Sequence, residues 1–272
     1  MKKAYLCAIM QNVKPKKQLG QHFLTSQKIA KDIVDALTWE GRAVEIGPGM
    51  GVLSRYLFER PDLDMRLVEV DQESVDYLKA AYSDKAERVI YGDFLRQEAD
   101  DFFGDDSPFA VIGNFPYNIS SQIFFRILEY KDRVPMVVGM LQREVALRLS
   151  SGPGTRDYGI LSVFLQAYYD IEYLFTVHED VFNPPPKVKS GVIRLRRNGV
   201  EKLDCDEVLF RKVVKATFGQ RRKMIWNGLK TLGLNIETLK DDPIVKRRPE
   251  QLGVAEFVDL TNKVAEASRA AR

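Results

Sequence analysis

"VEIGPGMG", residues 44–51, is the stretch that decides the fold class of this 272-residue chain. An apolar run ends here in closely spaced glycines, and a helical pattern follows. Glycines allow a tight turn and a close approach of the backbone to a ligand, and the amino terminus of a helix favours negative groups. A dinucleotide fingerprint needs its third glycine one position later, where Val52 stands. The stretch therefore predicts a turn between a strand and a helix that is atypical of NAD sites; a purely structural turn remains an alternative.

Short β-branched or aliphatic runs alternate with longer helical patterns from Arg42 to about Arg196. This alternation indicates a mainly parallel sheet with helices on its faces. The predicted strands are 43–47, 66–70, 88–92, 109–114 and 136–141, followed by 173–177 and 190–195 as an antiparallel hairpin at the sheet edge. The prolines of "NPPPKVK" (183–189) exclude a helix between the last two strands.

The composition changes at "RRNGVEKLDCDE" (196–207), which contains an Asn-Gly turn signal. Beyond it, "VLFRKVVKATF" and "PEQLGVAEFVDLTNKVAEAS" have helical periodicity. We therefore expect three parts: an N-terminal extension (1–13), an α/β domain (14–198) and a smaller all-helical domain (199–272).

The composition, with 45% hydrophobic and 29% charged residues, is typical of a soluble globular protein. The start, "MKKAYLCAIM", imitates a signal peptide, but the apolar run is short and no small-residue cleavage site follows it. Met10 is an alternative start to Met1. Cys7 and Cys205 are too few for a disulfide framework, which favours a cytoplasmic protein without a membrane segment. His22 and His178 are the only histidines, and no metal site is expected.

Positive charge is concentrated in four runs, although the formal net charge is only +3. The runs are "KPKK" (14–17), "RLRR" (194–197), "RKVVKATFGQRRK" (211–223) and "KRR" (246–248). Each run alone is more often a solvated surface than a binding site. Together they favour an anionic partner such as nucleic acid.

Acidic residues follow two of the predicted strands. Glu69 lies 22 residues after Gly47 at the end of the next strand, where a carboxylate can accept both hydroxyls of a ribose. Asp93 follows strand 88–92 and can accept from the amino group of an adenine ring. Either acid alone is more often a helix cap or a surface charge. Because open α/β sheets bind ligands at the carboxyl ends of their strands, we expect a nucleoside-binding crevice there.

The glycine loop has the form acid-x-Gly-x-Gly-x-Gly, with Glu45, Gly47, Gly49 and Gly51. It resembles the first motif of class I S-adenosylmethionine-dependent methyltransferases. The resemblance implies a Rossmann-like sheet and S-adenosylmethionine as the cofactor, bound by the loop together with Glu69 and Asp93.

"GNFPYNIS" (113–120) ends the fourth predicted strand beside the same crevice. An amine attached to a nucleobase is a poor nucleophile because its lone pair is delocalised into the ring. The Asn114 side-chain oxygen and the Phe115 carbonyl are acceptors that can draw such an amine towards a tetrahedral geometry. Pro116 fixes the turn, and Tyr117 can stack on the base. Transfer from a sulfonium donor then needs alignment rather than a side-chain base.

"NFPYNIS" resembles the motif of the rRNA adenine dimethyltransferases. "KKQLGQHFL" (16–24) and "VFNPPPKVKSGVIRL" (181–195) resemble two further motifs of that family. The resemblance implies that Gln21, His22 and Leu24 close over the cofactor, with Asn114 also beside it. It also implies that Phe182 stacks on the target adenine opposite Tyr117.

"FGQRRKMIWNGL" (218–229) resembles the branch of this family that acts on the small ribosomal subunit. That branch implies transfer of two methyl groups to N6 of each of two adjacent adenines in the 3′-terminal hairpin of small-subunit rRNA. The implied partner is a small-subunit assembly intermediate, contacted by Lys187, Arg221, Arg222 and Lys223, and the enzyme is expected to be a monomer.

Three departures from the family pattern concern local contacts: His22 stands for the commoner Asn, Phe115 for Leu, and Ile225-Trp226 for Leu-Arg. Two alternatives stay open. One is a large-subunit rRNA methyltransferase of the antibiotic-resistance type, and the other is a ribosome assembly factor whose binding role outweighs methylation.

Overall fold

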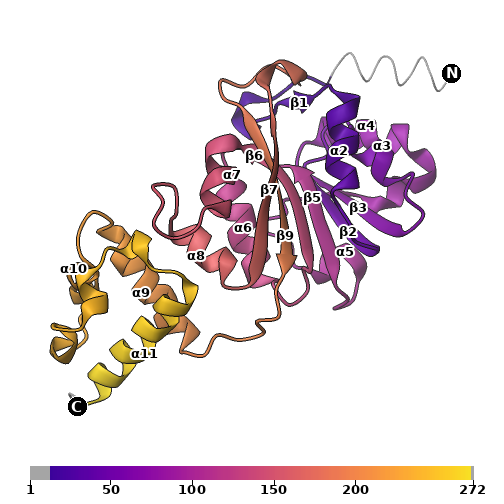
Figure 1. Cartoon of the computed structure of the whole chain (residues 1–272). Coiled ribbons are helices and arrows are strands. Elements are labelled where there is room, and N and C mark those ends of the chain that lie inside the picture. Colours follow the sequence, from indigo (N-terminus) through magenta and orange to yellow (C-terminus); the bar gives the residue numbers. More distant parts are fainter. Residues whose placement is uncertain (1–12, 271–272) are drawn as a thin grey trace. The chain divides into compact units, whose positions relative to one another are not determined.

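A computed structural model describes residues 13–270 of the chain, which form two compact units (Figure 1). The first unit comprises the residues up to Ala146 together with Ile171–Arg197, and the second comprises Leu147–Asp170 together with the residues from Asn198 onward. The predicted extension lies outside the described residues except for Val13, and so do Met1, Met10 and Cys7.

The first unit is built on a seven-stranded sheet in the order β4-β3-β2-β5-β6-β9-β7. Its strands are β2 (Gly41–Ile46), β3 (Leu63–Glu69), β4 (Val89–Tyr91), β5 (Phe109–Asn114), β6 (Met136–Gln142), β7 (Tyr169–Val177) and β9 (Ser190–Arg197). The strands from β4 to β6 pair in parallel, and β9 pairs antiparallel with β6. The predicted α/β class is confirmed, and the last two strands occupy one edge of the sheet.

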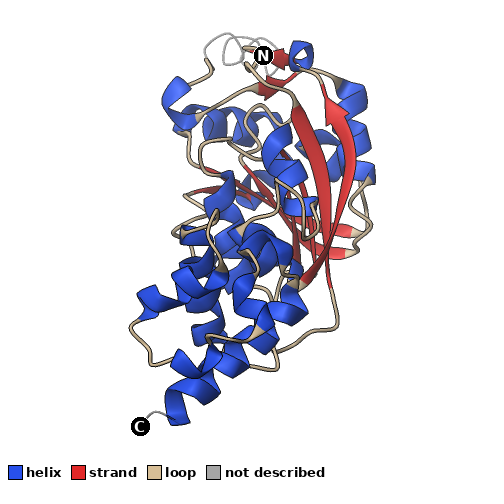
Figure 2. Cartoon of the chain, turned by 60° about the vertical axis from the view of Figure 1, so that its left-hand side comes forward, coloured by secondary structure: helices blue, strands red, loops and turns tan. Residues whose placement is uncertain are grey.

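Helices cover both faces of this sheet (Figures 1 and 2). Helices α2 (Gln27–Asp35), α3 (Ser54–Leu57) and α4 (Gln72–Ala81) pack with alternate strand residues, such as Ala43 and Ile112, in one hydrophobic cluster. Successive strand residues point to opposite faces, so the neighbouring Val44 and Val111 are buried on the other face. Helices α5 (Asp100–Phe103) and α6 (Ser120–Glu129) belong to that second layer.

The strand order reverses at β2, which lies between β3 and β5. Ile46 pairs with Val68 of β3, and Glu45 pairs with Ile112 of β5. The carboxyl ends of these parallel strands therefore meet at one edge of the sheet, which is where open α/β sheets bind their ligands.

A second, two-stranded sheet was not predicted from the sequence. It pairs β1 (Phe23–Leu24) antiparallel with β8 (Phe182–Asn183). Next to it, the Thr25 backbone N–H donates to the Val181 carbonyl at 2.8 Å, and the Thr25 hydroxyl donates to the same oxygen at 2.9 Å. The sequence does not predict this sheet because strands of two residues are too short to show a periodic pattern. The pairing holds the N-terminal arm (residues 16–25) against the segment that precedes β9.

The described elements of the second unit are helices and loops (Figure 2). Helix α7 (Arg143–Ser150) leads into it, and its main helices are α8 (Ile160–Gln166), α9 (Glu207–Gly219), α10 (Ile225–Leu229) and α11 (Val254–Ala270). Short 3-10 helices cover Lys230–Leu232, Glu237–Leu239, Pro243–Lys246 and Pro249–Gln251. The helices predicted after residue 207 are confirmed.

Residues 147–170 belong to the second unit, although the sequence suggested that they are part of the α/β domain. The reason is packing: Phe164 of α8 contacts Phe210 of α9, with ring centroids 6.1 Å apart. The pattern of α8 alone does not show which core receives its apolar face.

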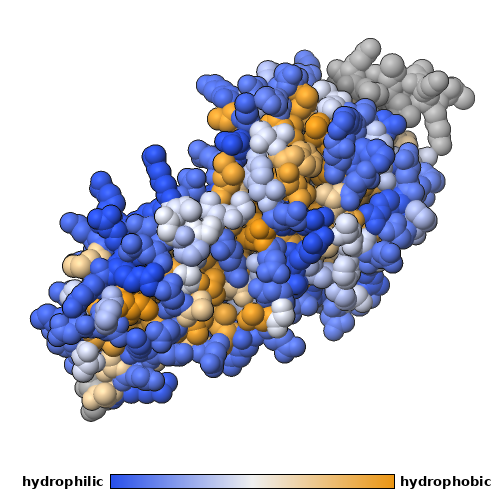
Figure 3. All heavy atoms as spheres, in the orientation of Figure 1, coloured by the Kyte–Doolittle hydropathy of each residue, from blue (hydrophilic) through white to orange (hydrophobic). Residues whose placement is uncertain are grey.

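The described residues include no helix that is long and apolar enough to span a membrane. Figure 3 shows a face on which hydrophilic residues predominate and apolar residues form smaller groups between them.

The contact between α9 and α10 yields a test of the second unit. A Cβ added at Gly228 would lie 2.5 Å from Thr217 Cα and 2.7 Å from the Ala216 carbonyl oxygen. Both atoms are backbone, so the helices must separate. We expect Gly228→Ala to lower the free energy of unfolding in urea by about 1–3 kcal/mol, although alanine normally favours a helix.

Gly219 at the end of α9 provides the matched control, because a Cβ there meets no atom within 4 Å. Gly219→Ala should leave the urea midpoint unchanged or raise it. Equal midpoints for the two variants would contradict the close approach of α9 and α10.

Candidate functional site

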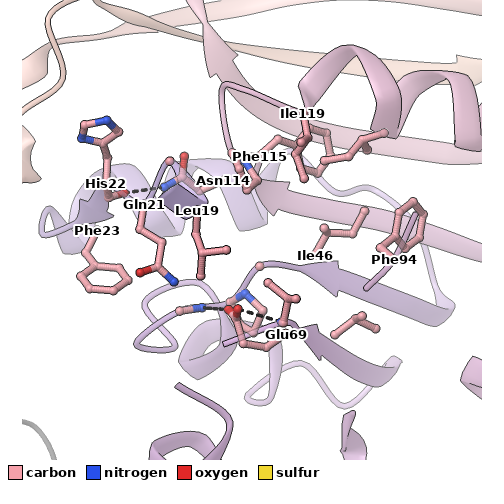
Figure 4. Close-up of a pocket in the computed structure, with 18 of the residues that line it drawn as sticks. Leu19, Gln21, His22, Phe23, Ile46, Glu69, Phe94, Asn114, Phe115 and Ile119 are labelled. Carbon is pink, nitrogen blue, oxygen red and sulfur yellow. Dashed lines mark hydrogen bonds between the residues drawn. The ribbon is translucent and has the colours of Figure 1, made fainter. Parts of the chain in front are cut away.

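A pocket opens at the carboxyl edge of the sheet, where β2, β3 and β5 end (Figure 4). The N-terminal arm covers one side of it. The lining residues come from five segments: Leu19–Leu24, Ile46–Leu53 except Gly51, Val68–Val70, Gly92–Leu95, and Asn114–Tyr117 with Ile119 and Ile123. All expected site residues in these segments line the pocket except Gly51, whereas Glu45, Phe182 and Lys187 do not.

The glycine loop needs its glycines for conformation and for space. Gly47, Gly49 and Gly51 have φ values of +63°, +55° and +73°, which L side chains rarely adopt. A Cβ added at Gly49 would lie 2.9 Å from Cε1 of Phe23. The Phe23 ring of the arm therefore packs directly on the loop, while Gly51 closes the turn with its N–H donating to the Pro48 carbonyl at 2.8 Å.

Glu69 lines the pocket from the end of β3 and is only 3% exposed. Its Oε1 accepts from the backbone N–H groups of Val70 and Asp71, both at 2.9 Å, and its Oε2 accepts from that of Gly49 at 3.0 Å. Burial raises the pKa of Glu69 despite these three bonds. A carboxylate has about four acceptor sites, so about one remains for a ligand hydroxyl.

Glu45 lies beneath the glycine loop, and it is 1% exposed. Its Oε2 accepts from the Ser54 hydroxyl at 2.6 Å, and its Oε1 has no partner among the described residues. Burial raises the pKa of Glu45 to about 8, and the nearby charge of Glu69 adds to this shift. The side chain is thus a protonated support of the loop at neutral pH, and direct contact with a cofactor stays a prediction.

Asp93 lines the pocket from the loop after β4. Its Oδ1 accepts from the backbone N–H of Leu95 at 3.0 Å, and its Oδ2 lies 3.5 Å from Nε of Arg96. Val70, Phe94 and Leu95 add apolar lining next to it. This part of the pocket combines an acceptor with apolar lining, which is a combination that suits an adenine ring.

The N-terminal arm is fastened to the first turn of α4 through Asp71, whose side chain is 1% exposed. Lys16 Nζ lies 2.5 Å from Asp71 Oδ1, and Gln21 Nε2 donates to Oδ2 at 3.3 Å. Although burial by itself raises the pKa of Asp71, the bonds from Lys16 and Gln21 bring it below its ordinary value. The Gln21 Oε1 also accepts from the Lys16 backbone N–H at 2.8 Å, so Gln21 organises the arm from within.

Asn114 has a defined orientation at the end of β5. Its Nδ2 donates to the backbone carbonyl of His22 at 3.0 Å (Figure 4). A carbonyl oxygen can only accept, so the amide nitrogen must face His22. The Asn114 Oδ1 is consequently the atom that can accept a hydrogen bond from a ligand.

Tyr117 contributes an aromatic wall to the pocket. Its hydroxyl lies 2.5 Å from the Ser190 hydroxyl, and burial raises its pKa. The His22 ring stacks on the Tyr117 ring with centroids 5.5 Å apart, and the His22 Nδ1 donates to the Pro184 carbonyl at 2.8 Å. His22 thus links the arm to Tyr117 and to the segment after β8.

Phe182 is 4% exposed and belongs to the hydrophobic cluster beneath the arm. It pairs with Leu24 in the small sheet. The described conformation therefore presents one of the two expected aromatic walls, Tyr117. Stacking of Phe182 on a base stays a prediction.

The expected RNA contacts lie outside the pocket. Lys187, Arg222 and Lys223 are exposed. Arg221 is half-buried, and its guanidinium donates to the backbone carbonyls of Thr155 and Arg156. Arg221 therefore also supports the loop before α8.

The sequence reasoning missed three groups in this region: Phe23, which packs on Gly49, and the pair formed by Lys16 and Asp71. Phe23 and Lys16 lie within the quoted stretch "KKQLGQHFL", but their partners are distant in sequence. Asp71 follows Glu69 by two residues, and an isolated aspartate at such a position predicts only a helix cap. Asp71 does have this role as well, because its Oδ1 accepts from the Glu73 backbone N–H at 3.2 Å.

The raised pKa of Glu45 predicts how stability depends on pH. Between the ordinary value of 4.5 and about 8, the folded protein keeps a proton that the unfolded chain has lost. The folded state binds more protons there, so stability falls as pH rises, by up to about 1.4 kcal/mol per pH unit. In urea melts across this range, Glu45→Gln should show a smaller fall than wild type, because only the contribution of Glu69, whose pKa is also raised, remains; the exposed Glu40→Gln should retain the full fall. Parallel curves for wild type and Glu45→Gln would contradict the assignment.

Comparisons with known proteins identify relatives of this chain. A model of the family described as ribosomal RNA adenine dimethylase matches residues 12–263. The ribosomal RNA small subunit methyltransferase A of Cytophaga hutchinsonii is 54% identical over 260 residues, which cover 94% of this chain and 99% of that protein. The protein of the same name from Bacteroides thetaiotaomicron is 53% identical over 264 residues, covering 96% and 98%.

Solved structures show the same fold at lower identity. A dimethyladenosine transferase from Plasmodium falciparum matches with a TM-score of 0.74 at 21% identity, covering 90% of this chain and 98% of that one. The 23S rRNA methyltransferase ErmE matches with a TM-score of 0.65 at 24% identity, covering 88% and 99%. The match of the family model and the two relatives more than 50% identical decide the assignment: the chain belongs to the ribosomal RNA adenine dimethylase family.

Proposed function

We propose that this protein transfers two methyl groups from S-adenosylmethionine to N6 of each of two adjacent adenines in the 3′-terminal hairpin of small-subunit rRNA. The orientation of Asn114 carries the proposal. With Nδ2 bound to the His22 carbonyl at 3.0 Å, Oδ1 is held at the pocket as an acceptor. An exocyclic amine is a donor that this atom recognises.

The pocket residues fit an adenosine-type cofactor. Glu69 keeps about one acceptor site for a ribose hydroxyl, and Asp93 offers a carboxylate at the pocket that can accept from an adenine amino group. The glycine loop offers its backbone, with Gly49 too close to Phe23 for any larger residue. The acceptor-rich lining also suits a cofactor with a positive sulfonium centre. When bound, this cofactor supplies an electrophilic methyl group and leaves as a neutral thioether.

The protein's own part in the reaction is to align the amine and stabilise its developing charge. As the N–C bond forms and the S–C bond breaks, N6 gains positive charge and then releases a proton to water. In the first transfer, Oδ1 of Asn114 and the carbonyl of Phe115 each accept a hydrogen bond from N6. In the second transfer N6 carries a single hydrogen, so it donates to only one of them. Tyr117, held by Ser190, supports the face of the base, and we propose that Phe182 covers the other face after leaving the hydrophobic cluster. A base outside its helix is the form of substrate that such a pocket accepts.

The exposed cations outside the pocket would hold the RNA backbone. Lys187 is an exposed residue in the segment between β8 and β9, and Arg222 and Lys223 are exposed in the second unit. Phosphate contacts of this kind fix position and register without reading the bases. We further propose that the protein acts as a monomer on an assembly intermediate of the small subunit in the cytoplasm.

Label transfer from S-[methyl-³H]adenosylmethionine tests the proposed function. Unmethylated small subunits and large subunits are assayed in parallel, and the labelled nucleosides are identified. We expect dimethyladenosine in the small subunit alone, and no label with Asn114→Ala even at a saturating concentration of S-adenosylmethionine. Label in the large subunit would identify a resistance-type enzyme. Binding without any label would identify an assembly factor.

A salt titration tests the RNA contacts of the second unit. Arg222→Ala and Lys223→Ala remove exposed charges, so subunit binding should weaken and the slope of log K against log salt should fall by about 1 for each phosphate that the variant no longer binds. Arg221→Ala should weaken binding and also lower the free energy of unfolding, because it frees the carbonyls of Thr155 and Arg156. Lys79→Ala, an exposed cation of α4, is the control with an unchanged slope. The same slope for all variants would exclude these contacts.

A further inference from the structure

Two glycines lie side by side on adjacent strands near the carboxyl end of β5. Gly113 of β5 and Gly139 of β6 are partners in the parallel register. The ring of Phe115 occupies the space that side chains at both positions would need. A Cβ at Gly139 would lie 2.5 Å from Cε2 of Phe115, and a Cβ at Gly113 would lie 3.0 Å from Cε1. The ring therefore rests with one edge on each glycine.

The Phe115 ring is fixed on its other sides as well. The residue is fully buried, and its ring meets that of Phe124 in α6 edge to face, with centroids 5.8 Å apart and an interplanar angle of 78°. Its backbone N–H donates to the Met140 carbonyl at 2.9 Å. Pro116 restricts the backbone of Phe115 to extended conformations. Residue 115 thus has almost no freedom to rotate.

This immobilised residue directly follows Asn114 and carries the second proposed acceptor, its own carbonyl. That carbonyl receives no hydrogen bond from the described residues. If the ring moved by about 1 Å, the backbone of Phe115 would shift with it, and so would the Phe115 carbonyl in the peptide to Pro116. Misplacement on this scale costs roughly 100-fold in rate when a reaction depends on alignment.

We propose that Phe115 is a positioning residue for methyl transfer and that the Gly113–Gly139 pair is its seat. The ring does not touch the substrate; it holds both acceptors at the angle that the N6 amine needs. The inference rests on the proposed function and extends it to Gly139, which does not line the pocket. It also explains how a phenylalanine is accommodated where the family commonly has leucine.

The test is a pair of compensating substitutions in the full-length protein. In Gly139→Ala the new Cβ displaces the ring, so kcat for label transfer into small subunits should fall about 10- to 100-fold. KM for the subunits and the Kd of S-adenosylmethionine should stay within about 2-fold, because the glycine loop, Glu69 and Asp93 follow other strands. Adding Phe115→Leu removes the clashing ring atoms at nearly conserved total volume, and it should restore most of kcat.

Gly113→Ala is the matched control. A Cβ at this position would also lie 2.5 Å from the Ile46 carbonyl oxygen, which is backbone and cannot turn aside. Phe115→Leu should therefore not rescue Gly113→Ala. The single variant Phe115→Leu leaves the seat partly empty without any overpacking, and it should lower kcat while the protein remains folded.

Three results would overturn the inference: unchanged kcat in Gly139→Ala, a loss of kcat that Phe115→Leu does not restore, or full activity of Phe115→Leu alone. Rescue of Gly139→Ala but not of Gly113→Ala supports it. A wild-type protein that labels no adenine would instead overturn the proposed function, so the two failures are distinguishable.

Discussion

The hydrogen bond from the Asn114 amide to the His22 carbonyl is the constraint on which the site depends. It joins the end of a buried strand to an arm that lies 92 residues earlier in the chain. Because a carbonyl only accepts, one bond both closes the arm over the pocket and fixes which atom of the amide faces the ligand. The contacts of Phe23 with Gly49 and of Lys16 with Asp71 hold the same arm in place.

The pocket recognises ligands mainly through acceptors. Glu69, Asp93 and Asn114 stand at the ends of β3, β4 and β5, which are parallel strands of one sheet, and the sheet register brings them to one edge. Such a lining favours ligands that carry hydroxyl and amino groups, and a cationic cofactor gains from the carboxylates. Beneath the loop, the protonated Glu45 bonded to Ser54 at 2.6 Å supports the turn without adding another negative charge.

Local patterns predicted much of this site. The glycine loop, the acids after β3 and β4, and the Asn-x-Pro-Tyr turn are each short in sequence, and the parallel sheet brings them together. Contacts between distant segments were not predictable: the pairing of β1 with β8, the burial of Phe182 beneath the arm, and the seat of Phe115 on two glycines. The place of residues 147–170 in the second unit likewise depends on α9, which comes after β7 and β9 in the chain.

The most direct test of this account is a crystal structure with S-adenosylhomocysteine and adenosine bound together. The account predicts that Nδ2 of Asn114 still donates to the His22 carbonyl and that Oδ1 lies about 3 Å from N6 of the adenosine. The Phe115 ring should remain on Gly113 and Gly139. An adenosine bound elsewhere, or an Asn114 amide turned so that Nδ2 faces the base, would contradict the central claim that this amide accepts from the methylated amine.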